Sequence, residues 1–385
     1  MVGRLLYTVA AVVVAGLVAA ACAAGSPVGP VAGSSVTAAR SRPLVQRLSL
    51  QQLAGQRIVY AYTGLKPPAS LLAAIRAGEA GGVIFFAPNI ASPGQLRGVI
   101  NVLQRASLAS PLHDRLLMLT DQEGGEVRRL PGAPIRSEKQ IGEAANAVSA
   151  ASTAGAGAGR NLRGVGINVN LAPVLDVYRQ SGNFIDEFQR SYSNNAGTVA
   201  KLGAAFITAQ QHLGVAATAK HFPGLGSASR RQNTDLVPVT LRSSLSTLRA
   251  VDEVPYVNAI AAGVKLVMTS WAIYPALDSR LPAGLSPAVI QGELRGRLGF
   301  AGVTITDGIE AGALAPFGSV GNRAVLAASA GADLILCATT NPDENAQAVG
   351  TAARNAIASA IAHGRIARGA AQQSAGRILA LRAGP

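Results

Sequence analysis

Several polar side chains stand at the carboxyl ends of short apolar runs, where a charge is costly unless it is paired or used. These residues are Asp121, Asp176, Lys220, His221, Trp271 and Asp307. Carboxylates, an amine and an imidazole that converge on one rim would form a polar pocket suited to chemistry. Lys220 also stands where a Schiff-base lysine could work. For each charged residue, an ion pair that merely closes the end of the fold is the alternative.

The apolar runs that carry these residues number eight, and longer amphipathic segments lie between them. The runs cover 57–63, 82–86, 116–121, 168–175, 217–222, 266–272, 303–308 and 333–338, and the helical candidates include 93–107, 197–213, 245–262 and 287–298. Continuous apolar runs are typical of parallel strands buried on both faces. Eight such runs predict an α/β fold, a TIM-type (β/α)8 barrel in a single domain. Such barrels carry their chemistry at the carboxyl ends of the strands.

The composition fits one large core. Of 385 residues, 49% are hydrophobic and 14% are charged, whereas about 25% charged residues is usual, so disorder and coiled coil are disfavoured. The net charge of +14 favours anionic surfaces, but the basic residues form no run, and no nucleic acid partner is expected. The two cysteines, Cys22 and Cys337, suggest neither a disulfide framework nor a metal cluster. We therefore expect no metal and no cofactor.

The N-terminus is typical of an export signal. Residues 1–4 carry one positive charge, 5–21 are apolar, and three alanines precede Cys22, which predicts a signal peptide over 1–21. Cysteine after small residues resembles a bacterial lipobox, in which Cys22 becomes the lipidated first residue. Residues 22–41 have the composition of a flexible spacer, and 42–385 would form the barrel. We expect a protein anchored by lipid on the outer face of the cytoplasmic membrane. Simple secretion and a retained membrane-spanning anchor are the alternatives.

Five segments occur in the order found in glycoside hydrolase family 3. They are DQEGGEVRRL (121–130), LAPVLDV (171–177), FQRSY (188–192), AKHFPG (219–224) and LGFAGVTITD (298–307). The chain most resembles the single-domain bacterial β-N-acetylglucosaminidases (β-N-acetylhexosaminidases) of that family. The resemblance implies a carbohydrate partner, expected to be a cell-wall glycan.

The resemblance also implies roles for individual residues. In the family, the aspartate after the Ser or Thr of the seventh strand attacks the anomeric carbon, and Asp307 after Thr306 matches it. A carboxylate can form a glycosyl ester and leave again, which gives retention of configuration through two displacements. The positions that match the sugar-holding residues are Asp121, Arg129, Arg190, Lys220 and His221.

Other roles are open for three of these sugar-holding positions. Arg129 and Arg190 could instead form structural ion pairs with carboxylates of the rim, and His221 could be a buried histidine bonded to the backbone. For Lys220, the KHFPG motif explains the amine as a sugar ligand and disfavours the Schiff base.

The loop after KHFPG departs from the family pattern. There the family has a further histidine and then an Asp-Ser-His unit whose Asp and His act as the proton donor pair. In this chain the first histidine is replaced by Leu225, and the unit aligns with Arg231, Gln232 and Asn233. The usual general acid is therefore absent. Because general acid catalysis contributes roughly 10²- to 10⁴-fold, its loss would slow unactivated glycosides severely.

Two carboxylates are candidate replacement acids. Asp235 reaches the position if the loop is realigned by two residues, and Glu310 lies one turn beyond Asp307. A charge that favours the start of a helix is the alternative reading of Glu310. Two function classes stay open: an exported retaining glycosidase with an altered acid loop, and a catalytically impaired sugar-binding pseudoenzyme.

Overall fold

The computed structural model describes residues 44–339 and 345–384. The predicted signal peptide, Cys22 and the predicted spacer lie outside these residues. Within the described part, no helix is both long and apolar enough to cross a membrane.

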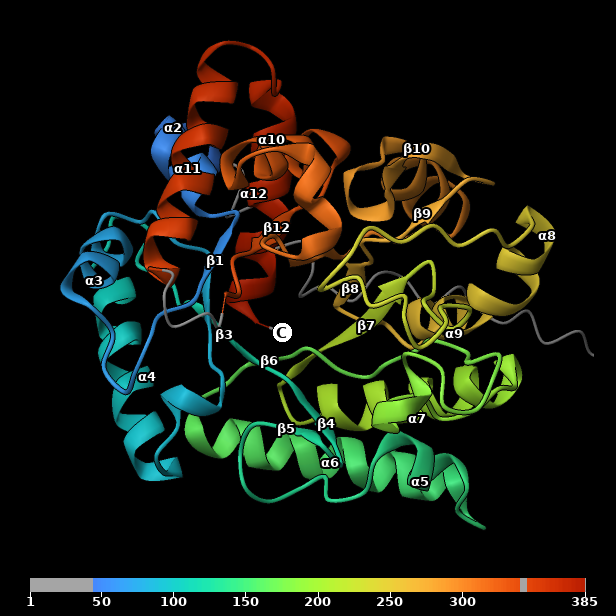
Figure 1. Ribbon diagram of the computed structural model, residues 1–385. Coiled ribbons are helices and arrows are strands. Elements are labelled where there is room, and N and C mark those ends of the chain that lie inside the picture. The colour runs from blue at the N-terminus through green and yellow to red at the C-terminus, as the bar shows by residue number, and fades with distance from the viewer. Residues whose placement is uncertain (1–43, 340–344, 385) are drawn as a thin grey trace, which may run out of the picture.

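Eight parallel strands close into a barrel at the centre of the molecule (Figure 1). They are β1 (Ile58–Tyr60), β2 (Gly82–Ile84), β3 (Leu117–Thr120), β6 (Val169–Asn170), β7 (Ala216–Phe222), β8 (Leu266–Thr269), β11 (Val303–Gly308) and β12 (Leu334–Leu336). Around the barrel their order is β1-β12-β11-β8-β7-β6-β3-β2, and β1 pairs with both β2 and β12. Each predicted run overlaps one of these strands, so the (β/α)8 prediction is confirmed.

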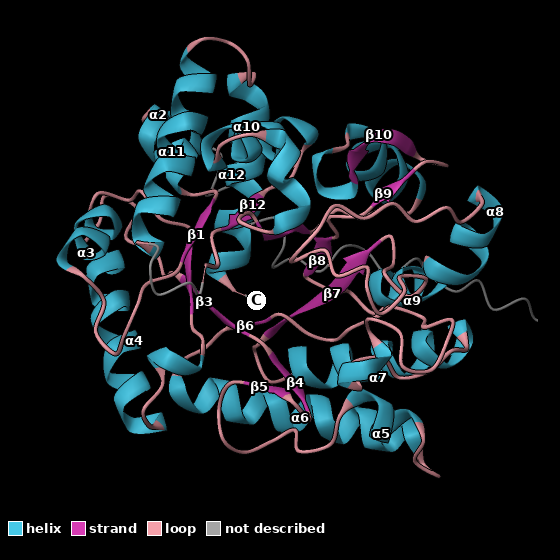
Figure 2. Ribbon diagram, viewed as in Figure 1, coloured by secondary structure: helices cyan, strands magenta, loops and turns pink. Residues whose placement is uncertain are grey.

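Helices surround the strands (Figure 2). They are α2 (Leu50–Gly55), α3 (Ala69–Arg76), α4 (Pro93–Leu108), α5 (Glu138–Gly142), α6 (Ala147–Val165), α7 (Ala196–Gln211), α8 (Leu245–Thr247), α9 (Val254–Ala261), α10 (Val320–Ala330), α11 (Ala346–Ala362) and α12 (Arg368–Ala383). The predicted helices at 93–107 and 197–213 correspond to α4 and α7. Their first turns are capped by the side chains of Ser92 and Asn195, which accept backbone N–H groups.

Two predicted helices differ from the observed elements. The segment 245–262 is divided into α8, a π-helix η3 (Leu248–Asp252) and α9. Pro255 in the first turn of α9 has no N–H to donate. Just before it, the N–H of Glu253 donates to the carbonyl of Leu248, five residues back, which is the hydrogen bond of a π-helix. The segment 287–298 forms a second π-helix, η5 (Ala288–Arg297).

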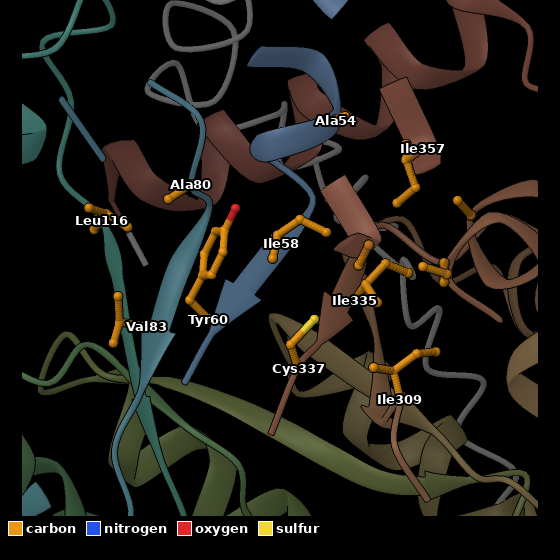
Figure 3. Packing of buried hydrophobic residues seen from close by; sticks show 14 of the residues in the cluster. Ala54, Ile58, Tyr60, Ala80, Val83, Leu116, Ile309, Ile335, Cys337 and Ile357 are labelled. Atoms are coloured by element: carbon orange, nitrogen blue, oxygen red, sulfur yellow. The ribbon is translucent and has the colours of Figure 1, made fainter. Parts of the chain in front are cut away.

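Two apolar layers hold the barrel together. Inside it, alternate strand residues such as Val59, Leu119 and Ile305 are fully or almost fully buried. On the outside, Ile58 of β1 and Ile335 of β12 pack in one cluster with helix residues that include Ile357 of α11 (Figure 3). Burial on both faces explains why the strands are continuous apolar runs.

The amino end of the barrel is closed by Asp333, which directly precedes β12 and is fully buried. Its carboxylate accepts hydrogen bonds from Arg295 at 2.6 Å and Arg377 at 2.7 Å, and also from Ser374 and from the backbone of Thr304. We expect Asp333→Ala to lower the free energy of unfolding by about 3–5 kcal/mol, because the partly buried guanidinium groups of Arg295 and Arg377 would lose the buried carboxylate that they share. Urea denaturation measures this change.

The control is Arg230→Ala, which removes an exposed partner of Glu187. Exposed ion pairs contribute little, so this variant should unfold near the wild-type midpoint. Equal midpoints for the Asp333 and Arg230 variants would show that Asp333 does not hold the barrel end.

Candidate active site

A cavity of about 850 Å³ opens at the carboxyl ends of the barrel strands. Ile84, Met268 and Leu336 bring β2, β8 and β12 to its wall, and β7 and β11 contribute residues near their carboxyl ends. This volume lies within the usual range for a small-molecule site. The polar side chains singled out in the sequence that line it are Asp121, Arg129, Arg190, Lys220, His221, Asp235, Asp307 and Glu310.

Two of the residues at strand ends do not line this cavity. Asp176 is fully buried behind His221, and Trp271 is fully buried in the core. The indole Nε1–H of Trp271 donates to the carbonyl of Gly308 at 2.8 Å. Trp271 therefore supports the strand end that carries Asp307 and does not face the pocket.

Asp307 stands near the end of β11 and is partly exposed to the cavity. Its Oδ1 accepts the N–H of Gly308 at 2.8 Å. The preceding residue, Thr306, is fully buried, and its hydroxyl accepts the N–H of Leu336 on β12 at 3.0 Å. These contacts fix the backbone on both sides of Asp307, so its carboxylate faces the cavity from a rigid strand end.

A chain of ion pairs forms one wall. Lys220 Nζ lies 2.8 Å from Oδ1 of Asp121 and 2.8 Å from Oε1 of Glu123. Arg190 makes a bidentate pair with Glu123, with both N–O distances 2.9 Å. Arg129 lies 3.9 Å from the other oxygen of Asp121. The wall therefore presents cations whose positions are set by carboxylates.

The protonation states within this wall follow from its charges. Burial acts to lower the pKa of Lys220, but the carboxylates of Asp121 and Glu123 raise it above its ordinary value. Burial likewise acts to raise the pKa of Glu123, but Arg190 and Lys220 lower it to about 2. A lysine held in its charged form cannot attack a carbonyl. The Schiff-base alternative for Lys220 therefore has no support in this environment.

His221 is oriented by the buried carboxylate of Asp176. Its Nδ1 lies 2.8 Å from Oδ2 of Asp176, and Oδ1 of the same carboxylate accepts the backbone N–H of Leu225 at 2.6 Å. An Nδ1–H that donates to Asp176 leaves Nε2 of the ring for the cavity. Asp176 thus contacts a cavity residue from inside the fold and sets the orientation of its ring.

The loop after KHFPG places the carboxylate of Asp235 at the cavity. The family pattern has its aspartate at the position of Arg231 instead. Arg231 is exposed, and neither it nor Asn233 lines the cavity. Asn233 instead accepts the N–H of Asp235 at 2.8 Å and forms a turn. The carbonyl of Asp235 accepts the N–H of Gly312 at 2.7 Å. Backbone bonds therefore anchor Asp235 to the segment that follows β11.

The two candidate acids differ in their surroundings. Asp235 is exposed as a residue, but partial burial of its carboxyl group, and then the charge of Asp307, raise the pKa of that group above its ordinary value of 3.8. Glu310 also lines the cavity, but its Oε2 accepts the backbone N–H of Ala338 at 3.1 Å. Asp235 therefore keeps its proton to a higher pH than a free aspartate does.

Glu123 was not singled out in the sequence. It lies in the hairpin of β4 (Gln122–Gly124) and β5 (Val127–Arg128), which no hydrophobic pattern predicts. The one available signal was a second acid, two residues after Asp121, in DQEGG. Among the described residues, no three His, Cys, Asp or Glu side chains gather where they could hold a metal ion.

Comparison with known proteins places the chain among related sequences. It matches the model of the Glycosyl hydrolase family 3 N terminal domain over residues 47–381. It is 47% identical over 336 residues to an uncharacterized secreted glycosyl hydrolase of Arthroderma benhamiae, and the matched region covers 87% of this chain and 93% of that protein. It is 34% identical over 266 residues to a β-hexosaminidase of Thioalkalivibrio sulfidiphilus, and the matched region covers 67% of this chain and 73% of the relative.

Solved structures share the barrel. A glycoside hydrolase family 3 β-N-acetylglucosaminidase from Paenibacillus sp. str. FPU-7 superposes with a TM-score of 0.80 at 37% identity, covering 87% of this chain and 62% of that one. The present chain thus spans less than two thirds of that neighbour. A β-N-acetylhexosaminidase from Beutenbergia cavernae gives a TM-score of 0.77 at 29% identity, covering 87% of this chain and 99% of that one.

Proposed function

The chain belongs to glycosyl hydrolase family 3 and is a glycoside hydrolase. We propose that it is an exported, retaining β-N-acetylhexosaminidase that acts on cell-wall glycans. We also propose that its general acid stands at a different position from that of the family pattern. The carrying observation is that Asp307 and Asp235 line the same cavity in different environments. Two carboxyl groups that face one cavity are suited to the roles of nucleophile and acid, and the raised pKa of Asp235 favours Asp235 as the acid. Relatives with β-hexosaminidase names support the sugar class.

In the proposed first step, the carboxylate of Asp307 attacks the anomeric carbon. The new ester bond forms as the glycosidic C–O bond breaks, and Asp235 gives its proton to the departing oxygen. Water then attacks the anomeric carbon and the ester bond breaks. Asp235 takes the proton from that water, and both carboxyl groups return to their starting states.

The cationic wall would hold the sugar during both steps. Lys220, Arg190 and Arg129 can donate to sugar hydroxyls, and Asp121 can accept from them. Binding at hydroxyls that do not react orients the anomeric carbon toward Asp307.

The proposal is tested by following an aryl N-acetyl-β-glucosaminide by NMR. We expect the β anomer of the free sugar to appear first, and an aryl β-glucoside to react far more slowly. Initial release of the α anomer would exclude the double displacement. Because Arg231 and Asn233 replace the family's acid pair, a sugar-binding pseudoenzyme is the second candidate, and binding of N-acetylglucosamine without turnover would favour it.

Export and anchoring concern residues outside the described part of the chain. The secreted relative supports export, and we propose that Cys22 carries the lipid. A spacer of about twenty residues would reach roughly 25 Å from the membrane. We expect Cys22→Ala to move the protein from the membrane fraction to the soluble fraction or to block its processing.

The control for this experiment is Cys337→Ala, since Cys337 is the other cysteine and is buried at the end of β12. This variant should stay with the membranes. Membrane partition of the Cys22 variant equal to that of the wild type, with the signal peptide removed as in the wild type, would disprove the anchor.

A further inference from the structure

One buried carboxylate lies behind the cavity and does not line it. Glu123 is 1% exposed and is absent from the cavity wall, whereas its two partners, Lys220 and Arg190, both line that wall. Oε1 of Glu123 contacts both cations, and Oε2 contacts Nε of Arg190. A single carboxylate therefore sets the position of two cations that face the cavity.

The hydrogen-bonding capacity of these cations is only partly used by the protein. Lysine has three N–H donors, and Nζ of Lys220 faces two carboxylate oxygens, one of Asp121 and one of Glu123. Arg190 uses Nε and Nη2 for Glu123, and within residues 44–339 and 345–384 no hydrogen bond involves its Nη1. The remaining donors of both cations are thus left for a molecule in the cavity.

Glu123 also has a buried acidic neighbour that bonds differently. Glu138, the first residue of α5, is 1% exposed, and its Oε1 accepts the backbone N–H of Val174 at 3.0 Å. Burial and the charge of Glu123 raise the pKa of Glu138 well above its ordinary value. Glu138 therefore keeps its proton to a higher pH than a free glutamate does. Within the described residues the two cations bond to Glu123, and no hydrogen bond or ion pair joins either of them to Glu138.

The backbone that carries Glu123 is fixed by the residue before it. The preceding residue, Gln122, is fully buried, and its side chain bonds to the backbone of Arg129, Leu130 and Ala133. The N–H of Gln122 donates to the side chain of Asn170 on β6 at 2.9 Å. Glu123 is thereby held at a constant place relative to the barrel, which is what a residue that positions others requires.

We propose that Glu123 is a positioning residue of the sugar site, which aims Lys220 and Arg190 at the sugar without touching it. This inference rests on the function proposed above. Without the Glu123 carboxylate, Lys220 would keep only Asp121, and Arg190 would lose both of its acceptors. The two cations would then repel each other, and the sugar would lose both affinity and orientation.

The test compares Glu123→Gln with Glu138→Gln. Both changes exchange a buried carboxyl group for an amide of the same shape, but only the first removes a carboxylate that pairs with Lys220 and Arg190. For Glu123→Gln we expect kcat/KM on an aryl N-acetyl-β-glucosaminide to fall about 100-fold, with a higher KM and a higher inhibition constant for free N-acetylglucosamine. Glu138→Gln should stay within about threefold of wild type. Equal behaviour of the two variants at equal folded fraction would overturn the proposal.

A double variant guards against misfolding of Glu123→Gln alone. Glu123→Gln with Arg190→Gln removes one charge of each sign and leaves a neutral pair at this place. If Glu123 acts through the cations, the combined loss in kcat/KM should be much smaller than the product of the single losses. A full product would show independent roles and would contradict the proposal. A wild type that is inactive on every N-acetylglucosaminide would refute the proposed function instead, and binding of N-acetylglucosamine would then still report on Glu123.

Discussion

Replacing Asp307 with asparagine is expected to reduce kcat/KM by on the order of 10⁴- to 10⁶-fold, the loss typical of removing a nucleophile. Asparagine keeps the size of the side chain, and its amide can still face the N–H of Gly308. It cannot form a glycosyl ester. Steady-state kinetics with an aryl N-acetyl-β-glucosaminide measure the loss, and mass spectrometry after reaction with a fluorinated N-acetylglucosaminyl fluoride detects the covalent intermediate.

The labelled residue decides this assignment. In the wild type, the fluorinated sugar should be recovered on the peptide that contains Asp307, and Asp307→Asn should carry no label. Glu143→Gln is the matched control, because Glu143 is exposed and lies outside the cavity wall. It should react like the wild type. A label on any other carboxylate of the wild type would disprove the role of Asp307.

The sequence predicted the barrel because its strands are buried on both faces and therefore stand out as continuous apolar runs. It did not predict the hairpin of β4 and β5, whose short strands are held by the side chain of Gln122 and not by an apolar face. The predicted helix over 245–262 is divided at η3, next to Pro255 in the first turn of α9. Proline fits the first turn of a helix but breaks its interior, and the sequence pattern does not show where the first turn begins. Such local hydrogen bonding leaves little trace in hydrophobic periodicity.

The same contrast holds for the site. Asp121, Lys220 and Asp307 could be proposed from sequence because a strand end fixes where a side chain points. Glu123 could not, because its partner Arg190 lies 67 residues away and the pair forms only when two loops meet above the barrel. The loop at 224–235 is a similar case, since alignment assigns the family's acid pair to Arg231 and Asn233, whereas the backbone turn brings Asp235 to the cavity.

Replacing Asp235 with asparagine is expected to reduce kcat/KM on alkyl N-acetyl-β-glucosaminides by about 10²- to 10⁴-fold, the usual contribution of a general acid. A dinitrophenyl glycoside should be far less affected in the first step, because its leaving group departs without a proton. The pKa of Asp235 is raised above its ordinary value by partial burial and by Asp307, so its acid form persists to higher pH than that of a free aspartate. The wild-type kcat/KM on alkyl substrates should therefore fall as the pH rises through this pKa, and the variant should lack that decline.

Azide separates the two candidate acids most sharply. In Asp235→Ala the second step lacks its base, and azide, which needs no deprotonation, should restore turnover of the dinitrophenyl glycoside and yield the β-glycosyl azide. Glu310→Ala is the matched comparison, because Glu310 lines the same cavity while one of its oxygens bonds to the backbone of Ala338. That variant should show neither azide rescue nor a change in the high-pH decline of kcat/KM.

If azide rescue and the loss of the high-pH decline both follow Glu310→Ala instead, the acid is Glu310. If neither variant separates alkyl from aryl substrates, the chain has no general acid at either position, and its turnover would be confined to leaving groups that need no proton.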